Sequence, residues 1–317
     1  MITKNFSEAI DVLNNGSLIG LPTETVYGLA GNALNEKAVQ KIYDLKNRPN
    51  SNPLIVHTYS LNEVQKYVAY IPAAGLKLAK TFWPGPLTLL LPKNNSIPSC
   101  VTSGSELVAF RIPNHTLALS LLKCLPYPLV APSANPYTRI SPTTAQMVYD
   151  YFGTQLPVIL DGGSCEKGIE STIIGFDGDL PIVYRQGAIS VDAIEFVIGN
   201  VDLKNEAVNA VVTPGMSKLH YAPKTKFIIV DNLEQFVLQN KNLKIGAIIM
   251  GKPQISLLKI KSRLLSNSND LEEASANLFK AMYELDRLKL DCIIIEQFPA
   301  IGIGKSLNDR ISRAAYV

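Results

Sequence analysis

The sequence predicts an α/β protein of two domains, and three observations support this. Over about the first two-thirds of the chain, short apolar runs of β-strand character alternate with stretches of helical periodicity. Near residue 203 the composition becomes polar, includes Pro214, Gly215 and Pro223, and loses any sustained period, which is typical of a linker. Beyond it, three fully apolar runs and a long helical pattern indicate parallel strands with helical crossovers, a small Rossmann-like domain. We expect domains at residues 1–202 and 225–317, joined by residues 203–224.

The elements follow from these runs in order. The runs that predict strands of the first domain lie at residues 17–22, 52–57, 87–92, 107–113, 127–132, 157–163, 170–176 and 181–187. The helical patterns of this domain lie at residues 34–46, 61–69, 73–81, 116–124 and 143–151. In the second domain we expect strands at residues 226–230, 245–250 and 292–298, and a helix at 270–290. Prolines flank many of the runs, so the larger sheet should have exposed rims and functional loops at its strand ends.

The composition narrows the class of protein. Among the 317 residues, 47% are hydrophobic and 18% charged, as in a globular protein, and the net charge of +3 does not by itself indicate nucleic-acid binding. The four cysteines and three histidines are scattered, with no CxxC pair, so we expect neither a zinc site nor a disulfide framework. The sequence shows no signal-peptide pattern and no apolar run near the ~20 residues that cross a membrane. We expect a cytoplasmic protein that does not interact with membranes.

Two cations at the end of the helix pattern 34–46 form the most informative segment. Lys46 and Arg48 precede Pro49, which should stop the helix because proline disfavours helical geometry in the preceding residue. An extended turn can aim both side chains at one polyphosphate. Alternatively, the two cations only offset the negative end of the helix dipole, and this segment alone does not decide between the two interpretations.

Further polar residues lie at strand ends. Thr23, Glu24 and Thr25 follow the run 17–22 and suit a small polar ligand, although from this segment alone hydroxyls that bond their own loop are the better-supported account. Arg111 ends an apolar run, where a buried guanidinium needs an anionic partner. Glu24, Glu106 and a substrate carboxylate remain alternatives for that partner.

The segment 131–136 places Ser133 and Asn135 two residues apart, and an extended backbone would turn both side chains to one side. Ser141 precedes a helix pattern, where a hydroxyl is usually a cap. Residues 168–172 and 185–187 complete the polar segments. Since no Ser-His-Asp order, metal-ligand cluster or carboxylate pair emerges, the site should act by positioning and charge neutralisation.

Residues 302–306, GIGKS, resemble a phosphate-binding P-loop. However, Pro299 occupies the position of the first glycine that the P-loop needs, and Leu307 replaces the third glycine of a dinucleotide fingerprint. We therefore expect a plain turn from a strand into a helix.

Taken in order, the segments PTETVYGL, KxR with NPLIVH, WPGPLTLLL, AFRIPNH, APSAN, GIESTII and YRQGAI closely resemble the threonylcarbamoyl-adenylate synthase family, also called YrdC-like. The resemblance covers about residues 10–195. The segment PGMSKLHYAP and the C-terminal GIGKSLNDRISRAA further resemble the long, two-domain form of this family. The resemblance implies a twisted mixed-sheet domain with a concave site, followed by the Rossmann-like domain.

The same resemblance implies the chemistry. Members of the family combine L-threonine, bicarbonate and ATP into threonylcarbamoyl-AMP and pyrophosphate, for threonylcarbamoyl (t6A) modification of tRNA. The ATP arrives with Mg²⁺. Such a reaction chiefly needs cations around the phosphates and tight positioning of the nucleophile. Transfer RNA and the downstream proteins of t6A formation are the macromolecular partners this would imply.

By resemblance, the catalytic residues are Lys46, Arg48, Ser133 and Asn135. The same matching assigns ATP contacts to Lys46, Arg48, Asn52, Ser133, Ser141, Arg185 and Tyr221, and threonine contacts to Thr25, His57, Arg111 and Ser171. Arg111 would pair with the threonine carboxylate, and Tyr221 would belong to a lid formed by the linker. For His57, the sequence alone favours a strand-end histidine, and only the resemblance favours a ligand contact.

Two competing functions remain open from the sequence. The domain also resembles folds that hold double-stranded RNA on a basic concave surface, so a tRNA-binding module without chemistry is one alternative. The other is a carbamoyl-adenylate-forming enzyme of hydrogenase maturation, although the acylphosphatase and zinc-finger segments that accompany such domains are missing here.

Overall fold

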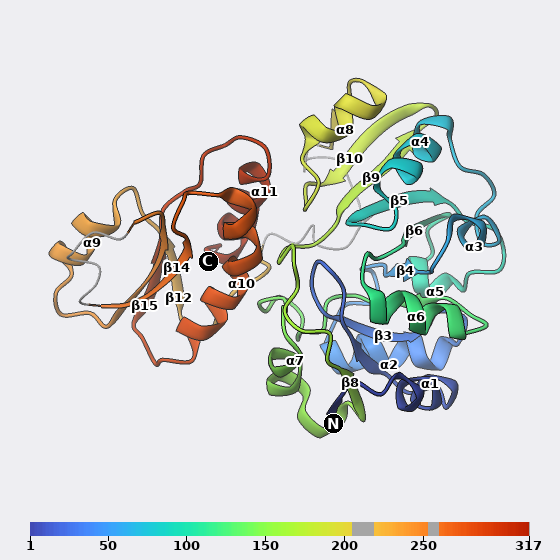
Figure 1. Ribbon diagram of the computed structural model, residues 1–317, viewed down its shortest axis with the longest axis horizontal. Coiled ribbons are helices and arrows are strands. Elements are labelled where there is room, and N and C mark those ends of the chain that lie inside the picture. Colours follow the sequence, from blue (N-terminus) through green and yellow to red (C-terminus); the bar gives the residue numbers. More distant parts are fainter. Residues whose placement is uncertain (205–218, 253–259, 317) are drawn as a thin grey trace. The chain divides into compact units, whose positions relative to one another are not determined.

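The computed structural model describes residues 1–204, 219–252 and 260–316. The chain forms two compact units (Figure 1). The first unit comprises residues 1–137, 142–166 and 170–216, and the second comprises residues 138–141, 167–169 and 217–317. Most of the predicted linker, with Pro214 and Gly215, lies outside the described residues.

The first unit is built on a mixed sheet in the order β1-β8-β2-β3-β7-β4-β6-β5-β9-β10-β11. Its strands are β1 (Ile2–Thr3), β2 (Ile19–Leu21), β3 (Gly28–Asn32), β4 (Ile55–His57), β5 (Leu87–Pro92), β6 (Leu107–Arg111), β7 (Leu129–Val130), β8 (Val158–Leu160), β9 (Thr172–Asp177), β10 (Leu180–Arg185) and β11 (Asp202–Leu203). Strand β6 pairs parallel to β4 and antiparallel to β5, so both orientations occur in one sheet. Each run predicted for this domain overlaps one of these strands, which confirms the predicted mixed sheet.

Strand β3 was not predicted, because its sequence GLAGN has none of the β-branched or aromatic residues that mark strands. Its glycines instead permit close packing. A Cβ on Gly31 would lie 2.7 Å from the Leu18 side chain, and one on Gly28 would lie 3.0 Å from Ala131. The strand therefore forms where neighbouring chains approach too closely for larger side chains.

The helices of the first unit are α1 (Phe6–Asn14), α2 (Glu36–Lys46), α3 (Leu61–Gln65), α4 (Ala73–Phe82), α5 (Ser99–Thr102), α6 (Thr116–Cys124), α7 (Ala145–Phe152), a short 3₁₀ turn (Gly153–Gln155) and α8 (Val191–Ile198). The predicted helix 61–69 is shorter than expected. It ends at Gln65 because Val68 forms a β-bridge with Lys93 and the Ala69 amide donates to the Pro92 carbonyl at 2.9 Å.

The core of the first unit lies on both faces of its sheet. Val130 of β7 packs in the cluster that contains the buried side of α2, whereas its neighbours Leu129 and Ala131 pack in the cluster that contains α1 and α6. Successive strand residues point to opposite faces, so a strand buried on both faces is apolar at most of its positions. This explains the continuous apolar runs in the sequence.

The second unit contains a four-stranded sheet in the order β12-β15-β13-β14, in which all neighbours are parallel. The strands are β12 (Lys226–Ile229), β13 (Ile245–Met250), β14 (Lys261–Ser266) and β15 (Cys292–Ile295), and the helices are α9 (Leu233–Gln239), α10 (Leu271–Asp286) and α11 (Gly304–Ala314). The predicted parallel sheet is confirmed. The edge strand β14 was missed because its sequence KSRLLS is half polar.

The P-loop-like segment is the predicted strand-to-helix turn. The Ile301 amide donates to Pro299 and the Gly304 amide donates to Ile301 as the chain leaves β15 and enters α11. A Cβ on Gly304 would lie 2.0 Å from the Pro299 carbonyl oxygen, so this glycine permits the tight turn. Across both units, none of the described helices is long and apolar enough to cross a bilayer.

Candidate active site

Lys46 is the last residue of α2 and lies on the buried side of this helix. Val39, Ile42 and Tyr43 are buried on this side, and Lys46 follows at the next helical position, with 1% of its surface exposed. Its Nζ donates to the Ser133 carbonyl at 2.6 Å and to the Asn135 carbonyl. Burial lowers the pKa of Lys46 well below its usual value, and the nearby Arg48 charge lowers it further. The ammonium is thus fixed on the backbone of the segment 131–136.

Helix α2 ends earlier than Pro49 requires. Asn47 adopts a left-handed conformation, with φ of 51°, and caps the helix. Its amide donates to Asp44, and the Arg48 amide donates to Tyr43 at 2.9 Å. The predicted end of the helix at Lys46 is confirmed, but the cap at Asn47 ends it rather than Pro49, and this cap separates Lys46 from Arg48.

Arg48 is fixed by the loop that follows it. Its Nε donates to the Asn52 carbonyl at 3.0 Å, and its Nη2 donates to Asn52 Oδ1 at 2.6 Å and to the Pro53 carbonyl at 2.9 Å. The guanidinium also lies 5.9 Å from the centre of the Tyr137 ring. Asn52, predicted to contact ATP, therefore orients Arg48 in this structure.

A third cation lies close to Arg48. Burial lowers the pKa of Arg48 to about 10, and the positive charge of Arg185 contributes to this shift. Since Arg48 also lowers the pKa of Lys46, Arg48 interacts electrostatically with two other buried cations of the first unit, Lys46 and Arg185. Cations that repel one another in a buried place are typical of a site for a multiply charged anion.

Arg185, at the end of β10, is anchored on Ser171. Its Nε and Nη2 donate to the Ser171 carbonyl at 3.1 and 2.8 Å, and Nη2 also donates to the Ser171 hydroxyl at 3.0 Å. The Ser171 hydroxyl lies 2.7 Å from that of Thr88 in β5. Ser171 and Arg185, which the resemblance assigned to different ligands, are thus in direct contact. Thr88 belongs to the same group of hydrogen-bonded residues, and the sequence analysis did not identify it.

The segment 131–136 differs from the expected geometry. The Asn135 amide donates to the Ser133 carbonyl at 3.0 Å, which makes a tight turn, so the expectation of an extended backbone was wrong. The carbonyl oxygens of Ser133 and Asn135 both accept a hydrogen bond from Lys46 Nζ. The four residues predicted to be catalytic are brought together, but Lys46 meets the backbone rather than the side chains of Ser133 and Asn135.

Arg111 has a carboxylate partner in the protein. Its Nη2 lies 2.7 Å from Glu24 Oε2, and both side chains are buried. Its Nε approaches the Gly85 carbonyl at 3.4 Å, and the adjacent Pro86 carbonyl accepts from the Thr172 amide at 3.0 Å. Of the two glutamates that the sequence left open, Glu24 is the one that lies beside Arg111, and a substrate carboxylate stays a prediction.

His57 lies beside Arg111, since the two residues pair in register between β4 and β6. Its Nδ1 lies 3.1 Å from the Ile55 carbonyl. Burial lowers the pKa of His57 to about 3, and the Arg111 charge adds to this effect. The imidazole is therefore neutral at neutral pH, with the proton on Nδ1 and an acceptor at Nε2.

Thr25 lies in the loop between β2 and β3. Its hydroxyl lies 2.9 Å from that of Thr23, which also donates to the Val26 carbonyl at 2.6 Å. The hydroxyls therefore bond within their own loop, as the sequence of this segment favoured. The same loop places Glu24 against Arg111.

Ser141 and Tyr221 belong to two separate segments of the second unit, residues 138–141 and 217–317. The Ala222 amide donates to the Thr138 carbonyl at 2.8 Å, so the short segments that carry these two residues run side by side. The ring of Tyr221 stacks on that of Phe279, with 5.3 Å between the ring centres. The Arg310 guanidinium carbon lies 5.1 Å from the centre of the Tyr221 ring. The interpretation of Ser141 as a helix cap was wrong, because Thr144 caps α7 by accepting from Met147.

No group of metal-ligating side chains stands out. Among the described residues, none of the clusters of His, Cys, Asp and Glu reaches three members. The cations at Lys46, Arg48 and Arg185 suit phosphate oxygens rather than a metal ion.

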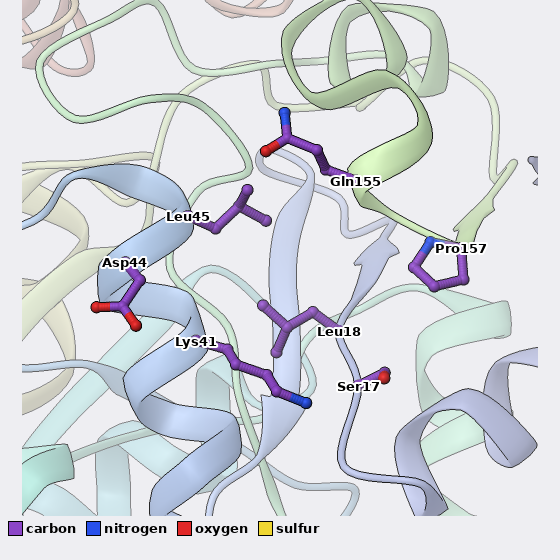
Figure 2. Close-up of a pocket in the computed structure, with 7 residues that line it drawn as sticks. All are labelled: Ser17, Leu18, Lys41, Asp44, Leu45, Gln155 and Pro157. Carbon is purple, nitrogen blue, oxygen red and sulfur yellow. The ribbon is translucent and has the colours of Figure 1, made fainter.

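A separate cavity of about 600 Å³ lies beside α2, on the side of Lys41 and Asp44 (Figure 2). Lys41 is exposed, and its ammonium donates to the Gly16 carbonyl at 2.8 Å. None of the predicted site residues lines this cavity. It offers a place for control substitutions on the same helix.

Comparison with known proteins relates this geometry to a family. Residues 11–187 match a family described as "Telomere recombination", and residues 189–316 match the threonylcarbamoyl-AMP synthase C-terminal domain. The chain is 36% identical to the threonylcarbamoyl-AMP synthase of Pyrococcus abyssi, over 97% of this chain and 93% of that protein. It belongs to the threonylcarbamoyl-AMP synthase family.

Other members of the threonylcarbamoyl-AMP synthase family agree. The Bacillus subtilis threonylcarbamoyl-AMP synthase is 34% identical over 98% of this chain and 92% of its own length. The crystal structure of P. abyssi Sua5 complexed with L-threonine matches with a TM-score of 0.91 and 35% identity, over 97% of this chain and 93% of that chain. The resemblance read from the sequence is confirmed, and so is the fold class of a YrdC-like domain with a C-terminal parallel-sheet domain.

The neutral His57 predicts how stability depends on pH. Its pKa is about 3 in the folded state and 6.5 when unperturbed, so between these values the unfolded state binds a proton that the folded state does not. Stability is therefore lost as pH falls through this window. The side-chain amide in His57→Asn can still donate to the Ile55 carbonyl. Between pH 7 and pH 4.5, we expect the free energy of unfolding of this variant to fall by about 2 to 3 kcal/mol less than that of the wild type.

Urea unfolding of both proteins at the two pH values measures this difference. A stability difference between wild type and variant that does not change with pH would show that the pKa of His57 is the same in the folded and unfolded protein, which would contradict the lowered pKa.

Proposed function

We propose that this protein is an L-threonylcarbamoyladenylate synthase, a nucleotidyltransferase that forms threonylcarbamoyl-AMP and pyrophosphate from L-threonine, bicarbonate and ATP. One observation carries the proposal beyond family membership: three buried cations occur together in the first unit, where the charge of Arg48 lowers the pKa of Lys46 and the charge of Arg185 lowers that of Arg48. Together these cations suit a triphosphate. Arg111, Glu24 and His57 offer charge and hydrogen bonds for a small amino acid.

The two parts of the site are joined by a chain of contacts. Arg185 is bonded to Ser171, and the next residue, Thr172, is bonded to the loop at Gly85 and Pro86 that also accepts from Arg111. A triphosphate at the cations and an amino acid at Arg111 would therefore bind to neighbouring parts of one framework. Such an arrangement supports reaction by positioning.

The chemistry requires few active groups. The amine of threonine and bicarbonate supply a carbamate, and the carbamate oxygen attacks the α-phosphorus, from which pyrophosphate leaves. Lys46, Arg48 and Arg185 would neutralise the phosphate charge that develops as pyrophosphate departs. Bound phosphate would also raise the lowered pKa of Lys46 again, because an anion favours the charged ammonium. Magnesium bound to ATP would shield the same phosphates.

The relatives support the choice of substrates. The P. abyssi structure contains L-threonine, and the names of the relatives specify threonylcarbamoyl-AMP. We extend this to a cytoplasmic role in t6A modification of tRNA, in which the product passes to downstream proteins. The segment around Tyr221 is proposed to cover the site as a lid that keeps water from the labile product.

Pyrophosphate release tests the function. We expect release from ATP only when L-threonine and bicarbonate are both present, since the carbamate must form before the α-phosphorus is attacked. Each is omitted in turn, and carbamoyl phosphate replaces both in a further reaction. Release without threonine, or with carbamoyl phosphate, would favour another carbamoylating enzyme. No release together with salt-dependent RNA binding would favour the RNA-binding module.

A further inference from the structure

Glu24 is a buried charged residue of the candidate site whose contact with a ligand has not yet been specified. It is 4% exposed and lies in the loop between β2 and β3. Its Oε2 is 2.7 Å from Arg111 Nη2, yet neither carboxylate oxygen has a hydrogen-bond partner, and neither has Arg111 Nη2. The two charges are thus adjacent, but the guanidinium N–H groups are not directed at the carboxylate.

Such a pair is incomplete as a structural element. A buried ion pair offsets the cost of desolvation only when further hydrogen bonds satisfy its remaining donors and acceptors. Thr23 and Thr25, which flank Glu24 in the chain, bond with each other instead. Within the described parts of the chain, the carboxylate therefore lacks the donors that it needs, and a ligand with several N–H groups would supply them.

The pair also matches the charges of a free amino acid. At neutral pH an amino acid carries one carboxylate and one ammonium, and the ammonium has three N–H donors. Arg111 and Glu24 present the two complementary charges side by side, next to the neutral His57. We propose that Glu24 binds the ammonium group of the substrate threonine while Arg111 binds its carboxylate. This inference rests on the proposed function.

The competing interpretation is that Glu24 only orients Arg111. Two ligands separate these roles. L-threoninol keeps the amine and hydroxyl of threonine but lacks the carboxylate, whereas 3-hydroxybutyrate keeps the carboxylate and hydroxyl but lacks the amine. If Glu24 binds the ammonium, its loss must weaken the binding of L-threoninol. If Glu24 acts only through Arg111, its loss must weaken the binding of 3-hydroxybutyrate.

Calorimetric dissociation constants for both ligands and for L-threonine test this in the wild type, Glu24→Gln and Arg111→Gln. We expect Glu24→Gln to raise the dissociation constants of threoninol and threonine about tenfold or more. The dissociation constant of 3-hydroxybutyrate should stay within about twofold of the wild-type value. Arg111→Gln should show the opposite preference. ATP binding should stay unchanged in both variants, which checks that the rest of the site is folded.

Weaker 3-hydroxybutyrate binding with unchanged threoninol binding in Glu24→Gln would overturn the proposal. If Glu24→Gln does not fold, Glu24→Asp retains the charge with a shorter reach, and it should weaken threoninol more than 3-hydroxybutyrate; equal effects would contradict the assignment. In the wild type, 3-hydroxybutyrate must bind more weakly than threonine, and equal affinity would overturn the proposal. A wild type that binds ATP but not threonine would instead contradict the proposed function itself.

Discussion

Replacing Lys46 with methionine is expected to lower kcat for pyrophosphate release about a thousandfold, the range over which a cation that stabilises phosphoryl transfer acts. Methionine fills a similar volume on the buried side of α2 but removes the charge. It also leaves the carbonyls of Ser133 and Asn135 without the donor that holds them. Both the charge at the phosphates and the position of the segment 131–136 are lost together.

The matched control is Lys41→Met. Lys41 lies on the same helix and also donates to a backbone carbonyl, that of Gly16, but it is exposed and lines the separate cavity (Figure 2). We expect its activity to stay within about twofold of the wild type, since exposed interactions contribute little. Steady-state kinetics of both variants measures the loss of kcat, and thermal melting shows whether both variants are folded. An active Lys46→Met enzyme, or an equal loss in Lys41→Met, would refute the role given to Lys46.

Replacing Gly187 with alanine is expected to destabilise the first unit by about 3 kcal/mol and to raise the KM for ATP about tenfold. A Cβ at this position would lie 2.4 Å from the Glu170 carbonyl oxygen and 2.5 Å from the Ser171 carbonyl oxygen. Backbone atoms cannot yield as a flexible side chain can. The displaced Ser171 carbonyl is the acceptor that anchors Arg185, so the cation would lose its position.

Gly178→Ala is the control, because Gly178 precedes the same strand, β10, that Gly187 follows. Gly178 lies between β9 and β10 and has a φ of 57°, and a Cβ added to it would have no atom within 4 Å. Its substitution should cost about 1 kcal/mol through backbone conformation alone and leave the KM for ATP unchanged. Urea unfolding and ATP-dependent kinetics compare the two variants. Equal KM values for Gly187→Ala and the wild type would show that Arg185 does not depend on this close approach.

The predicted strands followed from an unambiguous signal. Residues 87–92 and 107–113 are apolar without alternation, and both lie in a sheet that is buried on two faces. Strand β3 escaped prediction because its glycines are required by the proximity of Leu18 and Ala131, which the local sequence does not show. Periodicity reports burial, whereas close approach is a property of the assembled sheet.

The candidate site could be found only in part from the residue types. The spacing of Val39, Ile42 and Lys46 places a lysine on the buried side of α2, and a buried lysine is a sign of function that helical periodicity alone can reveal. In contrast, the partner of Arg111 was open until the loop between β2 and β3 brought Glu24 to 2.7 Å. Thr88 gave no local signal, because its contact with Ser171 joins residues far apart in the chain.

By itself the sequence determined the α/β class, the parallel C-terminal sheet and the family, because apolar runs and ordered motifs are local properties of the chain. The tertiary structure decided what the polar residues do. It turned the segment 131–136 so that carbonyls meet Lys46, made Asn52 the support of Arg48, and paired Arg111 with Glu24. These outcomes depend on how the folded backbone brings separate segments together, because the groups that surround a buried charge come from residues far apart in the chain.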